Sequence, residues 1–224
     1  MWNFLNPENK IVQLINRTAY SVVLSILWLL LSCTVIGFGP ATTALYHTTV
    51  KVLRKDAGSL FSTFFGSIRD SWKTTIPAGI LTLVLILSLV VIDLPNLQGL
   101  ISGNAEVSLF SGILSIIKLV VCPGIVLYMF PIFSRFQVGL ARGCFLSVVI
   151  ALRHLPTTLI LTCITVAILL LLWPQPLLVL ILPVAYWLFA SLFMEKVLIS
   201  HMSEEDRTPD PSKNQWYLEK DDIK

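Results

Sequence analysis

Long apolar runs alternate with polar connections along the chain, and this alternation predicts most of the fold. A helix needs about 20 mostly apolar residues to cross about 30 Å of hydrocarbon. Five runs approach or meet that length, at 20–36, 76–92, 109–130, 157–173 and 177–194. The pattern therefore predicts an all-α, polytopic transmembrane helical bundle, formed by a single membrane-embedded domain over residues 1–198.

Composition narrows the class of protein further. Of the 224 residues, 55% are hydrophobic and 13% are charged, whereas about 25% charged residues are usual in soluble domains. The net charge of +3 is too small to indicate nucleic acid as a partner, so the lipid bilayer is the partner that composition implies. Residues 199–224 carry seven acids and four bases without an apolar period, which predicts a charged, disordered cytoplasmic tail.

The basic residues lie in alternate connections between the runs. Connections 37–75 and 131–156 contain five and three Lys or Arg residues, whereas connections 95–107 and 174–176 contain none. In membrane proteins an excess of Lys and Arg marks the cytoplasmic loops. We therefore expect a multi-pass protein of the cell membrane whose basic connections and C-terminus lie in the cytoplasm.

One segment, GFGPATTALYHTTVKVLRKD, is not placed by this rule. Gly37, Gly39 and Pro40 end the first helix, and Pro40 can begin another. That second helix is too short and too polar to face lipid across a bilayer. It either lies on the cytoplasmic face, with the N-terminus outside, or packs within the bundle as a sixth, broken or re-entrant helix, with the N-terminus inside. Lys10 and Arg17 favour the second arrangement, whereas the shortness and polarity of the segment favour the first.

Two other segments, 58–75 and 134–155, combine an apolar stripe with basic residues. Each reads as an amphipathic helix on the cytoplasmic face, directly before a span. Their bases form a candidate surface for a partner subunit or for anionic lipid headgroups, made of Arg69, Lys73, Arg135, Arg142 and Arg153. A role as topology determinants alone explains the same residues.

The break after the first run is also a candidate functional site. Many transporters build their sites from broken helices at membrane depth. The residues that this break offers are Gly39, Pro40, Thr42, Thr43 and the following His47. In the alternative interpretation, the small residues allow close helix packing and the hydroxyls satisfy freed backbone groups.

Lys118 is the charged side chain that lies well inside an apolar run. An ionisable residue at membrane depth is a functional candidate, and Asp93 at the end of the second run is the nearest partner. The alternative is that Lys118 snorkels to the outer interface. Pro123 is expected to kink or break the helix beside it, so that Lys118 and Pro123 would face the bundle interior.

Signatures of enzymes are missing from the sequence. It contains no Gly-rich phosphate loop, no HExxH, no GxSxG and no pair of acids within an apolar run. The four cysteines form no CxxC pair. We therefore expect no enzymatic activity, no cofactor and no metal ion.

The segment IGFGPATTALYHTTVKVLRKDAGSLFSTFFGSIRDSWKTT resembles the hallmark region of the YesL family of bacterial membrane proteins. Its GPATTALY motif is followed by a basic cluster and a Phe-rich amphipathic stretch, and the later YMFPIFSRF and LRHLPTTLIL are similar to a further part of the family. The resemblance implies a multi-span protein without established biochemical activity, and it carries over no catalytic residue.

Members of that family are often encoded beside carbohydrate-uptake transporters and polysaccharide-degrading enzymes. The resemblance therefore implies an accessory role in carbohydrate uptake or utilisation, with the membrane subunits of a carbohydrate transporter as partners. The alternative is a small transporter or channel with a midplane site near Lys118 and the 37–49 break.

Overall fold

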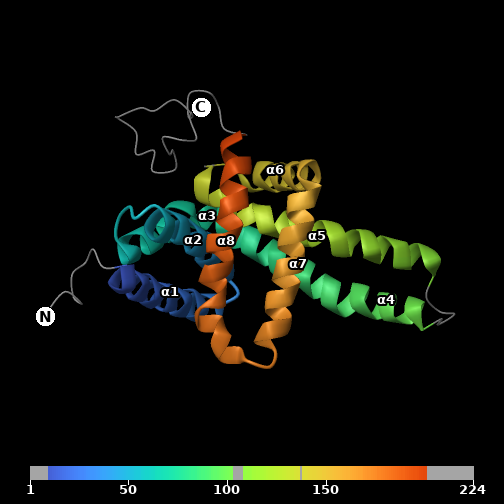
Figure 1. Ribbon diagram of the computed structural model, residues 1–224. Helices are drawn as coiled ribbons and strands as arrows, with labels where there is room; N and C mark the ends of the chain where they lie inside the picture. Colours follow the sequence, from blue (N-terminus) through green and yellow to red (C-terminus); the bar gives the residue numbers. More distant parts are fainter. Residues whose placement is uncertain (1–9, 103–107, 137, 201–224) are drawn as a thin grey trace, which may run out of the picture.

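Every secondary-structure element in the described part of the chain is a helix. The computed structural model describes residues 10–102, 108–136 and 138–200 (Figure 1). The elements in chain order are α1 (Lys10–Ser32), α2 (Phe38–Thr48), η2 (Thr49–Arg54), α3 (Leu60–Ser88), η3 (Leu89–Asp93), α4 (Leu94–Ile101), α5 (Leu109–Arg135), α6 (Leu140–Arg153), α7 (Leu155–Leu172), η4 (Pro176–Leu180) and α8 (Leu182–Ser200).

The predicted number of membrane spans is confirmed within these residues. Five stretches are long and apolar enough to cross a bilayer: Ile15–Ser32, Leu60–Ile101, Leu109–Arg135, Leu155–Leu172 and Leu182–Ser200. The protein is thus an all-α, multi-pass membrane protein. The tail predicted over 199–224 lies outside the described residues, apart from residues 199 and 200, which belong to α8.

A tight turn joins α1 to α2 at the predicted break. The Thr34 hydroxyl donates a 2.8 Å hydrogen bond to the Leu31 carbonyl and accepts one of 3.1 Å from the Gly37 N–H. A Cβ atom on Gly37 would lie 2.3 Å from the Leu31 oxygen, so the turn requires glycine there. Pro40 falls in the first turn of α2, where a missing N–H removes no helical hydrogen bond.

The π-helix η2 extends α2, and together they run back beside α1. Near the turn, the indole Nε1 of Trp28 donates to Thr42 Oγ1 at 3.2 Å. Farther along, Arg17 Nη2 and Asp56 Oδ2 form a 2.9 Å ion pair at the surface. Trp28, late in α1, thus meets Thr42, early in α2, whereas Arg17, earlier in α1, meets Asp56, after η2. The two segments are therefore antiparallel. Of the two positions that the sequence left open for this helix, the structure shows the second: α2 with η2 packs within the bundle and brings the chain back beside α1.

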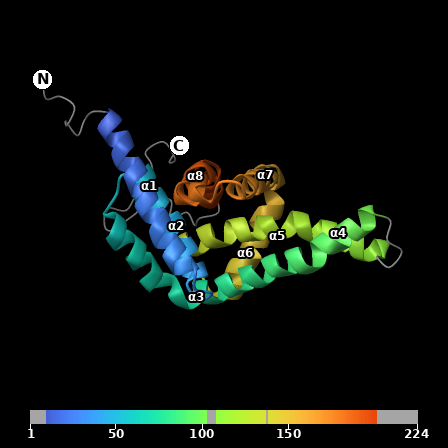
Figure 2. The same cartoon turned by 90° about the horizontal axis from the view of Figure 1, so that it is seen from below.

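The prediction of a separate surface helix over 58–75 is wrong. α3 begins at Leu60 and continues through Pro77 to Ser88, and η3 and α4 then prolong the helical stretch to a total of 42 residues. Figure 2 shows this stretch changing direction part-way along instead of ending. A proline inside a membrane helix is tolerated because neighbouring helices and Ser or Thr side chains satisfy the backbone groups that it frees.

Pro123 and Pro131 likewise lie inside the continuous helix α5, so Pro123 does not break the helix. The residue after Pro123 serves packing instead. A Cβ atom on Gly124 would lie 2.6 Å from Cγ2 of Thr158, so glycine allows α7 to approach α5 closely. Because α5 extends to Arg135, the predicted amphipathic helix over 134–155 is shortened to α6.

Two hairpins extend away from the middle of the molecule. One hairpin consists of the α3–α4 stretch and α5, and the other of α7 and α8; they point in different directions (Figures 1 and 2). Their outer surfaces expose large apolar side chains, among them Leu87, Val91, Leu169 and Leu170. Such surfaces suit contact with lipid.

The core lies where these elements meet, around α2. Among the largest fully buried side chains are Tyr46, Phe64, Tyr128 and Phe130. The main buried cluster draws residues from both hairpins, α1, α2, η2 and α6. The short helix that the sequence left unplaced is therefore the centre of the packing.

Candidate functional site

Residues 39–46, the segment GPATTALY, form the longest uninterrupted run of buried residues in the described part of the chain. Gly39 lies against α3 without space for a side chain. A Cβ atom there would be 1.9 Å from the Thr75 carbonyl oxygen and 2.9 Å from the Cα atom of Gly79. A Cβ atom on Gly79 would in turn be 2.5 Å from the Gly39 nitrogen. The two backbones touch, as small residues allow at helix contacts in membranes.

The hydroxyls of the break form hydrogen bonds inside the fold. Thr42 Oγ1 donates to the Phe38 carbonyl at 2.7 Å and accepts from the Trp28 indole. Thr43 Oγ1 donates to the Gly39 carbonyl at 3.0 Å. This geometry agrees with the packing interpretation of Gly39, Thr42 and Thr43.

The last residue of the segment belongs to a buried polar network. The Tyr46 hydroxyl donates a 2.6 Å hydrogen bond to Glu195 Oε1, and Arg135 Nη2 pairs with Glu195 Oε2. The Arg135 and Glu195 side chains are only 2% and 4% exposed. Arg135 is therefore not on the surface where the sequence analysis placed it. A carboxylate in an apolar helix is costly without a partner, and α5 extends far enough to supply one.

One face of α8 contacts Tyr46 of α2 and Arg54 of η2. Trp187 packs edge-on against Tyr46 with ring centroids 5.2 Å apart. Arg54 Nη1 donates to the Ser191 carbonyl at 2.9 Å. With Glu195, these α8 residues recur every four positions and so line a single face.

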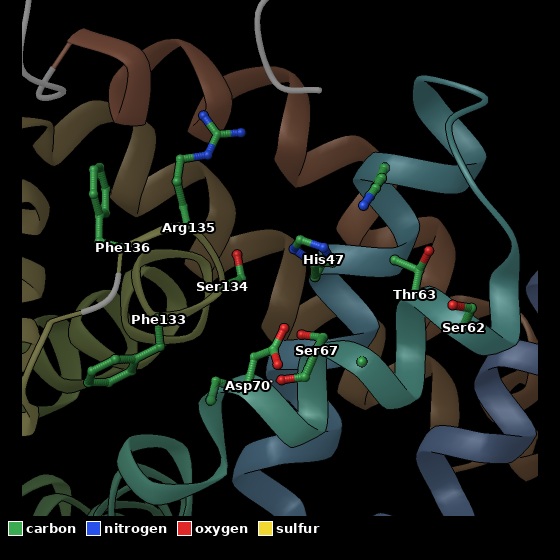
Figure 3. Close-up of a pocket in the computed structure, with 12 residues that line it drawn as sticks. His47, Ser62, Thr63, Ser67, Asp70, Phe133, Ser134, Arg135 and Phe136 are labelled. Carbon is green, nitrogen blue, oxygen red and sulfur yellow. Dashed lines mark hydrogen bonds between the residues drawn. The ribbon is translucent and has the colours of Figure 1, made fainter. Parts of the chain in front are cut away.

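A polar cavity of about 380 Å³ opens beside this network, between α2, η2, α3 and the end of α5 (Figure 3). Its lining residues are His47, Lys51, Ser62, Thr63, Gly66, Ser67, Asp70, Ser71, Phe133, Ser134, Arg135 and Phe136. Figure 3 shows His47 on α2 and Ser67 and Asp70 on α3 approaching one another across the cavity. Of the predicted candidates, only His47 and Arg135 reach it.

His47 is held uncharged at neutral pH. Burial, followed by the positive charge of Lys51, lowers the pKa of His47 from 6.5 to about 4, and a hydrogen bond with the Ser134 backbone and the nearby Asp70 oppose this shift. α2 is not one of the five candidate spans. An uncharged imidazole offers one hydrogen-bond donor and one acceptor.

Lys118 belongs to a second polar cluster, away from the cavity, in which its own side chain is 32% exposed and that of Asp93 is 4% exposed. Its Nζ atom lies 2.8 Å from Asp93 Oδ2 and donates to Ser88 Oγ at 2.8 Å. Ser115 Oγ donates to Asp93 Oδ1 at 2.9 Å. The pairing of Lys118 with Asp93, rather than snorkelling alone, is the arrangement that the structure shows.

The structure does not bring Lys118 to the 37–49 break. α5 reaches α2 at Phe130, whose ring packs edge-on against Phe38 with centroids 6.0 Å apart. Lys118 precedes Phe130 by about 18 Å along the helix axis. A single midplane site that combines Lys118 with the break is therefore not assembled.

The other predicted basic residues are exposed. Arg69 and Lys73 lie on α3, and Arg142 and Arg153 lie on α6. α3 and α6 contact each other, so these four residues belong to neighbouring elements. Lys73 Nζ also lies 5.9 Å from the ring centroid of Trp72.

Among the residues of the network and cavity that were not predicted as functional are Tyr46, Asp70 and Glu195. Glu195 carried a usable signal, since it is an acid directly after the last apolar run and lies four and eight positions after Ser191 and Trp187. Tyr46 and Asp70 carried no such signal, because their partners come from distant parts of the chain.

The comparisons with known proteins identify the N-terminal part of this arrangement. Residues 21–94 match a family model described as "Protein of unknown function, DUF624". The match covers 74 of the 224 residues, about a third of the chain. No curated protein and no solved structure matches the chain.

The DUF624 region extends from α1 to the first residue of α4. It contains the GPATTALY segment, Asp93 and the cavity residues that come from α2, η2 and α3. Arg135 and Glu195 lie outside it. The polar network therefore joins the DUF624 region to α5 and α8, and the cavity lies between that region and the end of α5.

Proposed function

We propose that this protein is a non-enzymatic accessory component of bacterial carbohydrate uptake or utilisation, which binds the membrane subunits of a carbohydrate transporter. The support for the biological context is the resemblance of residues 36–75 to the YesL family. That segment lies within the part of the chain that matches DUF624.

The observation that carries the accessory role, as opposed to transport by this chain itself, is the closed packing at the helix break. Gly39 and Gly79 touch through their backbones, and the hydroxyl of Thr43 is bonded to its own helix. Lys118 is paired with Asp93 elsewhere. Gly39, Thr42 and Thr43 are thus engaged in close packing and in hydrogen bonds within the fold, whereas His47 lines the cavity.

The basic residues indicate which end of the molecule faces the cytoplasm. One ion pair, Arg17–Asp56, joins α1 to the loop after η2, and another, Arg135–Glu195, joins the end of α5 to the last turns of α8. The connections at the tips of the two hairpins, 95–107 and 174–176, contain no Lys or Arg. On the positive-inside rule, the proposal has the base-bearing segments, and with them both ends of the described chain, facing the cytoplasm.

The docking surface for the transporter consists of the exposed bases of α3 and α6: Arg69, Lys73, Arg142 and Arg153. Exposed bases of this kind attract acidic segments on the cytoplasmic side of a partner and speed its association. The apolar surfaces of the two hairpins supply the contact within the membrane.

A pull-down from crosslinked native membranes tests this proposal. The tagged protein is expected to recover transporter membrane subunits, identified by mass spectrometry. Replacing the four bases by Glu is expected to lower that recovery at an unchanged level of the tagged protein. The control is Gln175→Glu, which adds a negative charge at the exposed turn between α7 and α8, away from α6 (Figure 1). Repeated recovery of no transporter component contradicts the proposal.

A further inference from the structure

The cavity beside His47 presents hydrogen-bond acceptors from several elements. The Ser71 hydroxyl donates its proton to the Ser67 carbonyl at 2.7 Å, and the Ser134 hydroxyl donates to the Pro131 carbonyl at 2.8 Å. Both oxygens therefore have lone pairs left for a ligand. The Asp70 carboxylate adds a stronger acceptor on the same wall. A ligand that fits must bring several donors of its own.

Donors line the same cavity. The Lys51 ammonium group and the hydroxyls of Ser62, Thr63 and Ser67 can each donate. A hydroxyl group can also accept a hydrogen bond, so the serine and threonine hydroxyls match ligand hydroxyls, which both donate and accept hydrogen bonds. This combination of donors and acceptors is what a molecule with many hydroxyl groups requires.

The charges on the lining favour a neutral ligand. Arg135 is already paired with Glu195, and Lys51 and Asp70 contribute one charge of each sign. No excess of positive charge is left for a phosphate group. Phe133 and Phe136 supply apolar surface, against which the C–H face of a sugar ring can pack.

The size of the cavity indicates a small molecule. Its volume of about 380 Å³ lies at the lower end of the range for small-molecule sites, roughly 300–1,000 Å³. We infer that the cavity between α2, α3 and the end of α5 binds a neutral mono- or disaccharide. The existence of a site for a neutral, hydroxyl-rich molecule follows from the lining alone, and only the choice of a sugar rests on the proposed function. With the orientation proposed above, the site is filled from the cytoplasm.

Binding to the purified full-length protein in detergent tests this inference. The probes are D-glucose, D-xylose and maltose, with inorganic phosphate and L-serine as comparison ligands, and binding is measured by saturation-transfer NMR and calorimetry. At least one of the three sugars is expected to bind. Asp70→Asn is expected to weaken that binding about ten-fold, because a hydrogen bond to a charged group is replaced by one to a neutral group.

A cavity-filling variant provides a second, independent test. A Cβ atom on Gly66 has no heavy atom within 4 Å, so Gly66→Phe adds a ring at the cavity without a backbone clash. This variant is expected to abolish sugar binding while keeping its gel-filtration profile. The matched controls are Gly139→Phe, where a Cβ atom also meets nothing within 4 Å, and Asp56→Asn. Neither residue lines the cavity, and both controls are expected to bind as the parent protein does.

Three outcomes overturn the inference. In the first, none of the three sugars binds; in the second, sugar binding survives both Asp70→Asn and Gly66→Phe. In the third, only phosphate or serine binds, and Gly66→Phe abolishes that binding.

The pull-down separates this inference from the proposed function. If transporter subunits are recovered but no sugar binds, the accessory role stands and the sugar site fails. If sugar binds but no subunit is recovered, the site stands and the accessory role fails.

Discussion

The Tyr46 hydroxyl donates a 2.6 Å hydrogen bond to Glu195 across 149 positions of sequence. Glu195 also pairs with Arg135, so each of its carboxylate oxygens has a partner from a different helix. A buried carboxylate persists only when its charge is paired and its oxygens are bonded. This one residue therefore connects α2, α5 and α8 beside the cavity.

Tyr46→Phe is expected to lower the free energy of unfolding by about 1–3 kcal/mol, because it leaves one oxygen of a buried carboxylate without its donor. The change can be measured by denaturant or thermal unfolding in detergent micelles. Tyr20→Phe is the matched control, since Tyr20 is 49% exposed. Equal stability of the two variants would show that the Tyr46–Glu195 hydrogen bond contributes nothing.

Gly39→Ala is expected to destabilise the protein by several kcal/mol, more than the roughly 1–3 kcal/mol typical of overpacking. The added methyl group would lie 1.9 Å from the Thr75 oxygen, and the atoms that must move belong to backbone. Gly139→Ala, at a position with open space, serves as the control. The readout is the melting temperature in detergent, and a Gly39→Ala variant that melts like the control would contradict the close contact between α2 and α3.

The features that the sequence predicted correctly depend on neighbouring residues. Span length and the break at Gly37 are such features, because hydrophobic length and turn geometry act locally. The surface position assigned to Arg135 was wrong because its burial depends on Glu195, 60 positions away. The separate helix over 58–75 was wrong because the rule that proline ends a helix weakens where other groups satisfy the freed backbone.

The cavity could not be predicted from the sequence for a related reason. His47, Asp70 and Ser134 come from three different elements, and no spacing along the chain relates them. The pattern marked His47 as a candidate only because it follows the break. Its actual surroundings depend on α2 packing inside the bundle, an arrangement that the sequence favoured but did not settle.

Lys118→Met is expected to lower the free energy of unfolding by about 3–5 kcal/mol, because it leaves the Asp93 carboxylate, which is 3% exposed, without its charged partner. The double variant Asp93→Leu with Lys118→Met is expected to recover most of that loss, since it removes both charges. Unfolding in detergent measures both variants. A double variant that is no more stable than Lys118→Met would contradict a direct pairing of the two side chains.

The stability of the protein is expected to decrease as the pH falls from about 6.5 to about 4. The pKa of His47 is about 4 in the folded protein, against 6.5 as its ordinary value. Between these values the unfolded chain binds a proton at His47 that the folded protein does not bind, so acid favours unfolding. The loss attributable to His47 at pH 5, relative to pH 7, is about 2 kcal/mol.

The charged groups that face His47 are Lys51 on η2, Asp70 on α3 and Arg135 on α5. Substitutions of His47 and of Lys51 therefore test whether His47 causes the pH dependence. His47→Gln is expected to reduce the difference in melting temperature between pH 7 and pH 5. Lys51→Met is expected to reduce it partly, because removing a positive charge moves the pKa of His47 back toward 6.5. If the full difference remains in His47→Gln, another group causes it. If Lys51→Met enlarges the difference, the ammonium group does not lower the pKa of His47, and the charges around the cavity differ from those described above.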